Sequence, residues 1–179
     1  MTEQHGNTAR RRLVIMRHAK SDWPPGVQDH DRPLNDRGRQ EAPLAGAWLR
    51  EHGLVPDLIL CSSAVRTRQT CELVCGELGD AATVPDPQFD DALYAASAPR
   101  MLAVINHVPD TVQTLLVIAH MPGVQELAMH LASNDSDPDA YQRAAEHVAT
   151  SALMVFEVDS PWGELDGYDA RLVNFVKRR

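Results

Sequence analysis

Short apolar runs alternate with longer helical patterns along this chain, and this alternation limits the possible folds more than any other feature. The apolar runs are typical of strands, and they cover residues 12–16, 57–61, 114–119, 152–158 and 171–176. The first three are almost continuous in apolar residues, as in strands covered on both faces. Helical periodicity fills the intervals, at residues 35–52, 63–78, 98–108, 123–132 and 138–148. This order predicts an α/β fold in which helices flank a largely parallel, twisted sheet.

Length and turn signals refine this prediction. A chain of 179 residues favours one domain, which we expect at residues 12–176 after a flexible N-terminal tail at residues 1–11. Residues 160–169 are typical of a turn, so the last two strands are expected to form an antiparallel hairpin at one edge of the sheet. Pro43 lies inside the first helical pattern. Because proline lacks a backbone donor, it predicts either a kink or a late start of that helix.

The charge and hydropathy of the chain argue against two classes of partner. The net charge is −8 and the isoelectric point is about 5.4, whereas a general nucleic-acid binder needs a basic face. The basic clusters at residues 10–12 and 177–179 are expected to be solvated tails. No apolar run approaches the roughly 18 residues of a membrane span, and residues 13–16 are too short for the core of a signal peptide. We therefore expect a soluble cytoplasmic protein with no nucleic-acid or membrane partner.

The three cysteines, Cys61, Cys71 and Cys75, do not indicate a disulfide framework, because their number is odd and the expected compartment is reducing. Cys71 and Cys75 are four residues apart and could present two metal ligands on one side of a helix. No pair of cysteines or histidines lies nearby in the sequence to complete such a site, and both cysteines belong to an apolar helical stripe. Core packing is therefore the expected role, and we expect neither a metal nor another cofactor.

Polar residues follow each of the three most apolar strands. The first strand is followed by Arg17 and His18, the third by His120, and the second by a serine-rich turn into a helix that carries Arg66 in its first turn. Ligands of open α/β sheets bind beyond the carboxyl ends of the strands, so we expect these side chains to converge. Each has an ordinary explanation alone, as a loop histidine or a solvent-facing arginine. Their joint occurrence predicts a functional site.

This set of side chains favours phosphoryl transfer. Arginine presents paired donors that match phosphate oxygens, and a helix N-terminus adds backbone N–H groups directed at the same anion. The helix dipole opposes a positive side chain at that end, so Arg66 indicates a nearby anion. Histidine can act as a nucleophile and form a covalent phosphorylated intermediate when one ring nitrogen is unprotonated. Fixed cations stabilise the charge on a transferring phosphoryl group, which fits a metal-free mechanism.

The same residues carry a resemblance to the histidine phosphatase superfamily, also called the phosphoglycerate mutase-like family. The family's Arg-His-Gly after the first strand corresponds to Arg17, His18 and Ala19. Its next arginine corresponds to Arg66 in "CSSAVRTRQT", and its second histidine to His120 in "LLVIAHMPG". The pieces "RHAKS", "DRPLNDRGRQEA" and "LYAAS" resemble the small SixA-like branch of phosphohistidine phosphatases. The resemblance covers roughly residues 12–132 and implies a single-domain, phosphoglycerate mutase-like fold.

The resemblance implies a role for each matching residue. His18 would be the phosphorylated nucleophile, while Arg17, Arg66 and His120 would hold phosphoryl oxygens. The implied activity is that of a metal-independent phosphatase for phosphohistidine, with a phosphohistidine-bearing protein as the expected partner. Small phosphate esters are the alternative substrate, and a catalytically weak phosphate-binding regulatory module is a further alternative. A nucleotide-binding protein is disfavoured, because no glycine-rich phosphate motif follows the first strand.

Several positions near the nucleophile are less well defined by the resemblance. Lys20 and Ser21 are candidates for the phosphate pocket, with a solvated loop as the alternative. Ala19 replaces the usual glycine, which matters if that position needs a positive φ. Many members have an asparagine that helps to bind phosphate where Pro24 stands here. Asn35 in "DRPLNDRG" is equally well explained as a helix N-cap.

A general acid is the least defined part of the implied mechanism. Larger members carry a glutamate in a sizeable insertion, and this chain has "PQFDDALYAAS" in that region. Asp90 and Asp91 are candidate proton donors, with ordinary solvation as the alternative, and Asp22 is a third candidate. An alkoxide leaving group depends strongly on protonation, whereas the nitrogen of phosphohistidine is a better leaving group once it is protonated. The lack of a clear acid in the sequence therefore favours P–N substrates, or esters with good leaving groups.

Overall fold

A computed structural model describes residues 10–178, which form a six-stranded sheet with the strand order β3-β2-β4-β1-β5-β6. The strands are β1 Arg11–Arg17, β2 Leu58–Ser62, β3 Gln88–Asp90, β4 Thr114–Ala119, β5 Leu153–Val158 and β6 Ala170–Val176. β1 to β4 are parallel to one another, whereas β5 runs antiparallel to its neighbours β1 and β6. The predicted largely parallel sheet with an antiparallel edge hairpin is confirmed.

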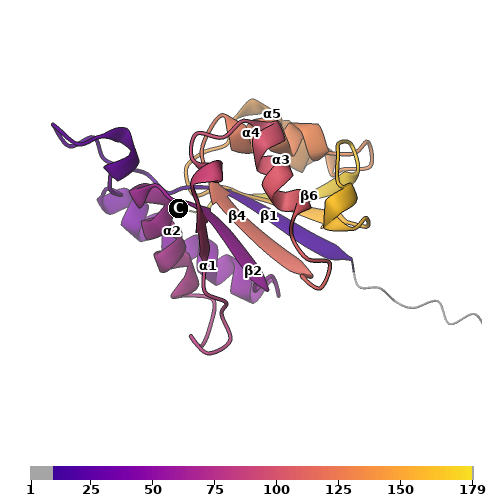
Figure 1. Cartoon of the computed structure of the whole chain (residues 1–179), viewed down its shortest axis with the longest axis horizontal. Helices are drawn as coiled ribbons and strands as arrows, with labels where there is room; N and C mark the ends of the chain where they lie inside the picture. Colours follow the sequence, from indigo (N-terminus) through magenta and orange to yellow (C-terminus); the bar gives the residue numbers. More distant parts are fainter. Residues whose placement is uncertain (1–9, 179) are drawn as a thin grey trace, which may run out of the picture.

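Helices cover both faces of the sheet, with α1 and α2 on one face and α3, α4 and α5 on the other (Figure 1). Their bounds are α1 Asp36–Glu51, α2 Val65–Cys75, α3 Ala98–Asn106, α4 Gly123–Leu131 and α5 Pro138–Glu146. Three 3₁₀ turns lie in the connections: η1 Asp29–Asp31, η2 Asp91–Leu93 and η3 Trp162–Glu164. Each α-helix falls inside one of the predicted helical ranges, because apolar periodicity is strongest where a helix packs on a sheet.

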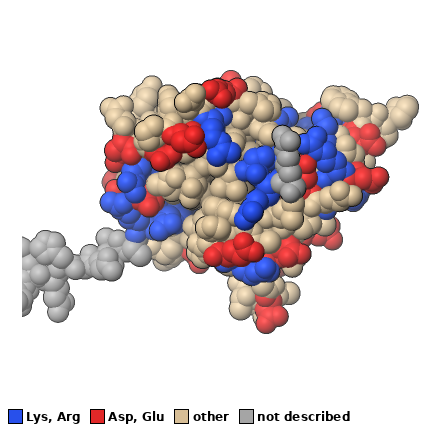
Figure 2. Space-filling view, turned by 180° about the vertical axis from the view of Figure 1, so that it is seen from behind, with Lys and Arg blue, Asp and Glu red and all other residues tan. Residues whose placement is uncertain are grey.

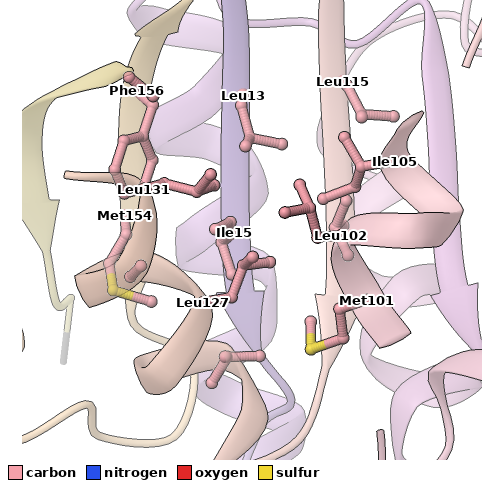
Figure 3. Packing of buried hydrophobic residues seen from close by; sticks show 14 of the residues in the cluster. Leu13, Ile15, Met101, Leu102, Ile105, Leu115, Leu127, Leu131, Met154 and Phe156 are labelled. Atoms are coloured by element: carbon pink, nitrogen blue, oxygen red, sulfur yellow. The ribbon is translucent and has the colours of Figure 1, made fainter. Parts of the chain in front are cut away.

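Two apolar layers hold the helices to the sheet, and β1 contributes to both. Leu13 and Ile15 are fully buried on the side of α3 and α4, where they pack against apolar side chains of these helices (Figure 3). Val14 and Met16 alternate with them and are buried on the side of α1 and α2. Burying each such side chain contributes about 1.5–3 kcal/mol. A strand covered on both faces must be apolar at every position, which explains the continuous apolar run.

Helix α1 begins at its expected cap and passes through Pro43. Asn35 stands just before the helix, and its side-chain oxygen accepts a hydrogen bond from the Gly38 N–H at 2.9 Å. The helix continues without a break in its assignment to Glu51, so the late start that Pro43 offered as one alternative is wrong. A Cβ atom on Gly38 would lie 2.2 Å from the Lys20 carbonyl oxygen. Glycine at this position therefore lets α1 pack directly against the backbone that follows β1.

The short strand β3 is missing from the sequence prediction. It has three residues, and its exposed and half-buried side chains show no apolar period. β3 pairs in parallel with β2 and forms one edge of the sheet. Its place in the sheet comes from backbone pairing with β2 rather than from burial, which is why a search for apolar runs does not find it.

The basic clusters are not simply solvated tails, and that prediction is wrong for their inner residues. Arg11 is the first residue of β1. The ammonium group of Lys177 donates to Glu41 Oε2 and to the Thr150 carbonyl oxygen, both at 2.6 Å. Residues 1–9 of the predicted tail and Arg179 lie outside the described residues. On the face shown in Figure 2, basic and acidic side chains are interspersed rather than gathered by sign.

The remaining sequence predictions concern cysteines and membrane segments. Cys61 and Cys71 are buried, Cys75 is half-buried, and the sulfur atoms of Cys71 and Cys75 are 3.9 Å apart without a disulfide bond. The core packing expected for Cys71 and Cys75 is confirmed, because Cys71 lies inside the apolar cluster under α1 and α2 and Cys75 packs against it. Across residues 10–178, no helix combines the length and hydropathy that a membrane span requires.

Candidate active site

Three neighbouring strands bring the predicted site residues together. β4 lies between β1 and β2, so the carboxyl ends of these parallel strands are adjacent. His18 follows β1, His120 follows β4, and Arg66 is the second residue of the helix after β2. The ring centroids of His18 and His120 are 5.2 Å apart. Residues from distant parts of the chain thus share one edge of the sheet.

The ring of His18 is oriented by its own loop. Its Nδ1 lies 2.7 Å from the Ala19 carbonyl oxygen, and because a carbonyl can only accept, Nδ1 carries the proton. Nε2 is then the unprotonated nitrogen. The residue is 7% exposed, and burial lowers the pKa of His18 from 6.5 to about 3. The imidazole is therefore neutral at physiological pH and keeps a lone pair on Nε2.

Ala19 adopts an ordinary backbone conformation, since it is not among the residues with a positive φ. Its N–H donates to Thr70 Oγ1 at 3.0 Å, and the Thr70 hydroxyl donates to the Arg66 carbonyl oxygen at 2.7 Å. These bonds tie the loop of His18 to α2. The alanine that replaces the family's glycine is therefore not strained by a left-handed backbone conformation.

His120 is buried and has one partnered nitrogen. Its Nε2 lies 2.7 Å from the Ser62 hydroxyl oxygen, whereas its Nδ1 is buried without a hydrogen-bond partner among the described residues. Burial, and secondarily the charge of Arg66, lowers the pKa of His120 from 6.5 to about 4. Buried polar atoms without partners are uncommon in folded proteins, so Nδ1 is available to hydrogen-bond a further polar atom.

Arg17 ends β1 and also has an unused donor. Its Nη1 donates to the Val148 carbonyl oxygen at 2.8 Å, while its Nε is buried without a partner within the described part of the chain. Burial lowers the pKa of Arg17 below its ordinary value. A half-buried guanidinium whose buried Nε is a free donor is suited to binding an anion.

Arg66 lies in the first turn of α2 and is paired with Asp29. Its Nη1 donates to the Asp29 backbone oxygen at 2.6 Å, and its Nη2 donates to Asp29 Oδ2 at 3.1 Å. The α2 dipole alone would disfavour a cation here. Asp29 is thus the nearby anion that the position of Arg66 indicates.

Asp29 also contacts two further side chains. Its Oδ1 accepts a hydrogen bond from Arg32 Nη1 at 3.0 Å, and its Oδ2 accepts one from the Tyr94 hydroxyl at 2.6 Å. The Tyr94 hydrogen bond, followed by those from the two arginines, holds the pKa of Asp29 well below 3.8. The Tyr94 ring stands edge-on to His30 and to His120, with centroid distances of 4.8 and 5.6 Å. Asp29 and Tyr94 therefore lie beside the histidine pair. We use the name site mouth for the group formed by Asp29, Tyr94, His30 and Ser63.

Residues 19–35 form a segment that projects from the carboxyl ends of the strands, seen in indigo in Figure 1. Arg32 holds it together, because its Nε donates to the Asp22 backbone oxygen at 2.9 Å and its Nη2 to Ser21 Oγ at 2.6 Å. The Trp23 ring stacks on the Arg32 guanidinium, 3.2 Å from centroid to carbon. His30 Nε2 contacts Ser63 Oγ at 3.0 Å and joins the segment to the turn between β2 and α2. The segment is thus fastened to the sheet edge by polar contacts.

The weaker pocket candidates occupy different surroundings. The Ser21 hydroxyl oxygen accepts the hydrogen bond from Arg32 and is buried. Lys20 is exposed, and its backbone oxygen accepts a hydrogen bond from the Asn35 N–H at 3.0 Å. Ser21 therefore belongs to the framework of the projecting segment, and Lys20 presents its ammonium group to solvent.

None of the three candidate proton donors has a hydrogen bond or ion pair to His18, His120 or Arg66 within residues 10–178. The Asp90 carboxylate accepts from the Ala92 N–H at 2.8 Å and so caps η2. Asp91 and Asp22 are exposed, and the Asp22 carboxylate accepts from the Trp23 N–H. The carboxylate that lies at the mouth is Asp29, which the sequence did not single out. Its position in "QDHDRPLND" carries no period or spacing that would have indicated it.

Ser62, His30 and Tyr94 were also missed as site residues. The serine-rich strand end and the piece "LYAAS" contain Ser62 and Tyr94, so the family motifs included two of the three without assigning them a contact. His30 lies in a polar loop whose fold depends on Arg32. These residues are found only when the distances between separate loops are known.

The two histidines and two arginines at this edge are the residues that carry the resemblance noted in the sequence. The family model described as "Histidine phosphatase superfamily (branch 1)" matches residues 13–96. The chain belongs to this superfamily.

Individual proteins agree with this assignment. An uncharacterised protein of Mycobacterium tuberculosis (strain ATCC 25618 / H37Rv) is 40% identical over 161 residues, or 89% of this chain and 98% of the relative. The structure of a candidate phosphohistidine phosphatase SixA from Nakamurella multipartitia has a TM-score of 0.80 and 32% identity, covering 93% of this chain and 95% of that one. A second SixA candidate, from Agrobacterium tumefaciens, has a TM-score of 0.75 and 27% identity, covering 94% and 98%. The predicted SixA-like branch and the phosphoglycerate mutase-like fold are confirmed.

Proposed function

We propose that this protein is a metal-independent phosphatase that acts through a phosphohistidine intermediate on His18. The observation that carries the proposal is the arrangement of the four predicted side chains. His18 keeps an unprotonated Nε2, and the buried Nδ1 of His120 and Nε of Arg17 have no partner within the described residues. With Arg66, these groups supply a nucleophile and donors for the oxygens of one phosphoryl group.

In the first step, Nε2 of His18 attacks phosphorus in line with the leaving group. The Nε2–P bond forms while the bond from phosphorus to the leaving atom breaks. Arg17, Arg66 and His120 donate to the three equatorial oxygens, where negative charge accumulates. For His120 to donate from Nδ1, its Nε2 must accept from the Ser62 hydroxyl, which the 2.7 Å contact allows.

In the second step, water attacks the phosphorus of phosphorylated His18. The new P–O bond forms as the Nε2–P bond breaks, both hydrogens of the water leave with orthophosphate, and His18 returns to its neutral form. The hydrogen bond from Nδ1 to the Ala19 oxygen keeps the ring in one tautomer throughout.

The substrate that this site fits best is phosphohistidine in a protein. A phosphoimidazole protonated on its second nitrogen leaves as neutral imidazole and needs no acid from the enzyme. Such a leaving group suits this site, because Asp29, the carboxylate at the mouth, is kept ionised by Tyr94 and two arginines. The relatives from Nakamurella and Agrobacterium, named as candidate phosphohistidine phosphatases, support the same class.

The test compares the full chain with His18→Ala in EDTA, using p-nitrophenyl phosphate and a histidine peptide phosphorylated with phosphoramidate. We expect turnover of the peptide, loss of more than about 10³-fold in His18→Ala, and acid-labile phosphate trapped on His18 in the wild type. The exposed His107→Ala variant is the control and should keep full activity. Turnover that requires a metal, or that survives in His18→Ala, would overturn the proposal.

A further inference from the structure

A groove of about 590 Å³ runs between α2 and residues 79–89, outside the site described above. Its size is within the range of ligand-binding clefts. Apolar groups dominate its lining, which includes Cys75, Val84, Pro85, Pro87 and Phe89. Phe89 lies on the edge strand β3 and is 43% exposed. An exposed aromatic side chain in an apolar cleft is typical of an interaction surface.

One end of this groove reaches the site mouth. Arg68 lines the groove, and its guanidinium lies over the Phe89 ring at 4.4 Å. The Nε of the same arginine donates to the Ser63 backbone oxygen at 2.8 Å, and the Ser63 hydroxyl contacts His30 at 3.0 Å. Phe89 is therefore connected to the mouth through one arginine.

A matching arrangement lies on the projecting segment that carries Asp29. Trp23 is 72% exposed and stacks on Arg32, which bonds directly to Asp29 at the mouth. Two exposed aromatic rings thus border the mouth, each supported by an arginine that is hydrogen-bonded to a mouth residue. Exposed aromatic side chains supported in this way are typical anchors of protein recognition. A phosphate ester of a few atoms would lie at the histidines and would not extend to either ring.

We propose that the groove and Trp23 bind the polypeptide that flanks the phosphorylated residue of a protein substrate, a proposal that rests on the function proposed above. Continuity with the mouth identifies this occupant, because a chain whose phosphorylated side chain enters the site continues past the residues that are joined to the mouth, which include Phe89 and Trp23. The outer side of β3 is not paired within the sheet, so its backbone can bond to an extended segment. An apolar residue of that segment then packs on Phe89.

Binding to a His18→Ala background tests this proposal without relying on turnover. The probes are a fluorescent peptide with one phosphohistidine flanked by apolar residues, and free phosphohistidine as a competitor. We expect the phosphopeptide to bind at least about tenfold more tightly than free phosphohistidine, and Phe89→Ala or Trp23→Ala to weaken it by about tenfold. Tyr168→Ala is the matched control, because Tyr168 is also 72% exposed but follows η3, near the amino-terminal end of β6. It should leave binding unchanged.

A kinetic comparison separates docking from catalysis. In the otherwise wild-type chain, Phe89→Ala should lower kcat/KM for the phosphopeptide by about tenfold and leave kcat/KM for p-nitrophenyl phosphate within about twofold. An equal loss on both substrates, or a phosphopeptide that binds no better than free phosphohistidine, would overturn the proposal. A wild-type dimer that Phe89→Ala converts to a monomer in sedimentation velocity would also overturn it, because the groove would then bind a second copy.

Peptide binding that depends on Phe89, without turnover by the wild type, would support the docking surface and contradict only the proposed catalysis.

Discussion

Asp29 accepts two hydrogen bonds from the Arg66 guanidinium, one on its backbone oxygen and one on its carboxylate. The pair joins residues 37 positions apart and places a negative charge beside the arginine proposed to bind phosphate. Arg32 and Tyr94 bond to the same carboxylate. Asp29 therefore balances two buried arginines, and the proposed mechanism requires Arg66 to bond to Asp29 and to the phosphoryl group.

Replacing Asp29 with asparagine tests this competition. Asparagine can keep a hydrogen bond to Arg66 while removing the charge. We expect vanadate, a phosphate mimic, to bind about three- to tenfold more tightly, the Coulomb effect of one charge several ångströms away in a solvated site. Inhibition of p-nitrophenyl phosphate hydrolysis gives the affinity. Asp31→Asn makes the same charge change at a residue without a contact to Arg66 and is the control. Weaker vanadate binding in Asp29→Asn would show instead that the carboxylate acts mainly by holding Arg66.

The two buried histidines predict a loss of stability in acid. Each has a folded-state pKa below its ordinary value of 6.5, about 3 for His18 and about 4 for His120. The unfolded chain therefore binds protons first as the pH falls below 6.5. As the pH falls from 6.5 to its folded-state pKa, each histidine lowers the free energy of unfolding by up to about 1.4 kcal/mol per pH unit. Above pH 6.5 both contributions are fully present.

Urea unfolding between pH 7 and pH 4 checks this prediction. The double variant His18→Ala/His120→Ala should lose less free energy of unfolding over that range than the wild type. The variant of an exposed histidine, His147→Ala, should follow the wild-type curve. Parallel curves for the double variant and the wild type would contradict the depressed pKa values.

Ser62→Ala tests how His120 is oriented. The substitution leaves His120 Nε2 buried without a partner, which should lower the free energy of unfolding by about 1–3 kcal/mol. Because the tautomer of His120 would no longer be set, we also expect kcat to fall by about tenfold or more. Ser63→Ala is the neighbouring control, since its hydroxyl contacts His30 instead. If Ser62→Ala keeps its kcat, the Ser62 hydroxyl has no part in orienting the ring.

Gly38→Ala tests the packing of α1 against the loop after β1. The new Cβ would lie 2.2 Å from the Lys20 carbonyl oxygen, so the backbone next to Ala19 and His18 must move. We expect a loss of about 1–3 kcal/mol of stability, typical of overpacking, together with reduced kcat. At Gly163 the nearest atom to a new Cβ is 3.5 Å away, so Gly163→Ala should change neither quantity. Thermal unfolding and p-nitrophenyl phosphate kinetics measure both effects.

The sequence by itself determined the order of the helices and of every strand except β3. It also identified four polar residues, three directly at strand ends and Arg66 in the helix that follows β2. Apolar periodicity reports burial along one element, so the continuous run at Leu13–Met16 was readable without a structure. The parallel order then implied that Arg17, His18, Arg66 and His120 share one edge. The family motifs pointed to the same residues.

Tertiary structure alone decided which loop side chains join these four residues at that edge. The Tyr94 hydroxyl and the Asp29 carboxylate are 65 residues apart, and neither belongs to a periodic pattern. Their contact depends on how the projecting segment folds around Arg32 and on where β3 pairs with β2. Polar loop residues carry no burial signal of their own, and their partners are set by the packing of distant elements. For this reason the residues proposed to bind phosphate were predicted from the sequence, while Asp29, Tyr94 and the groove beside Phe89 were not.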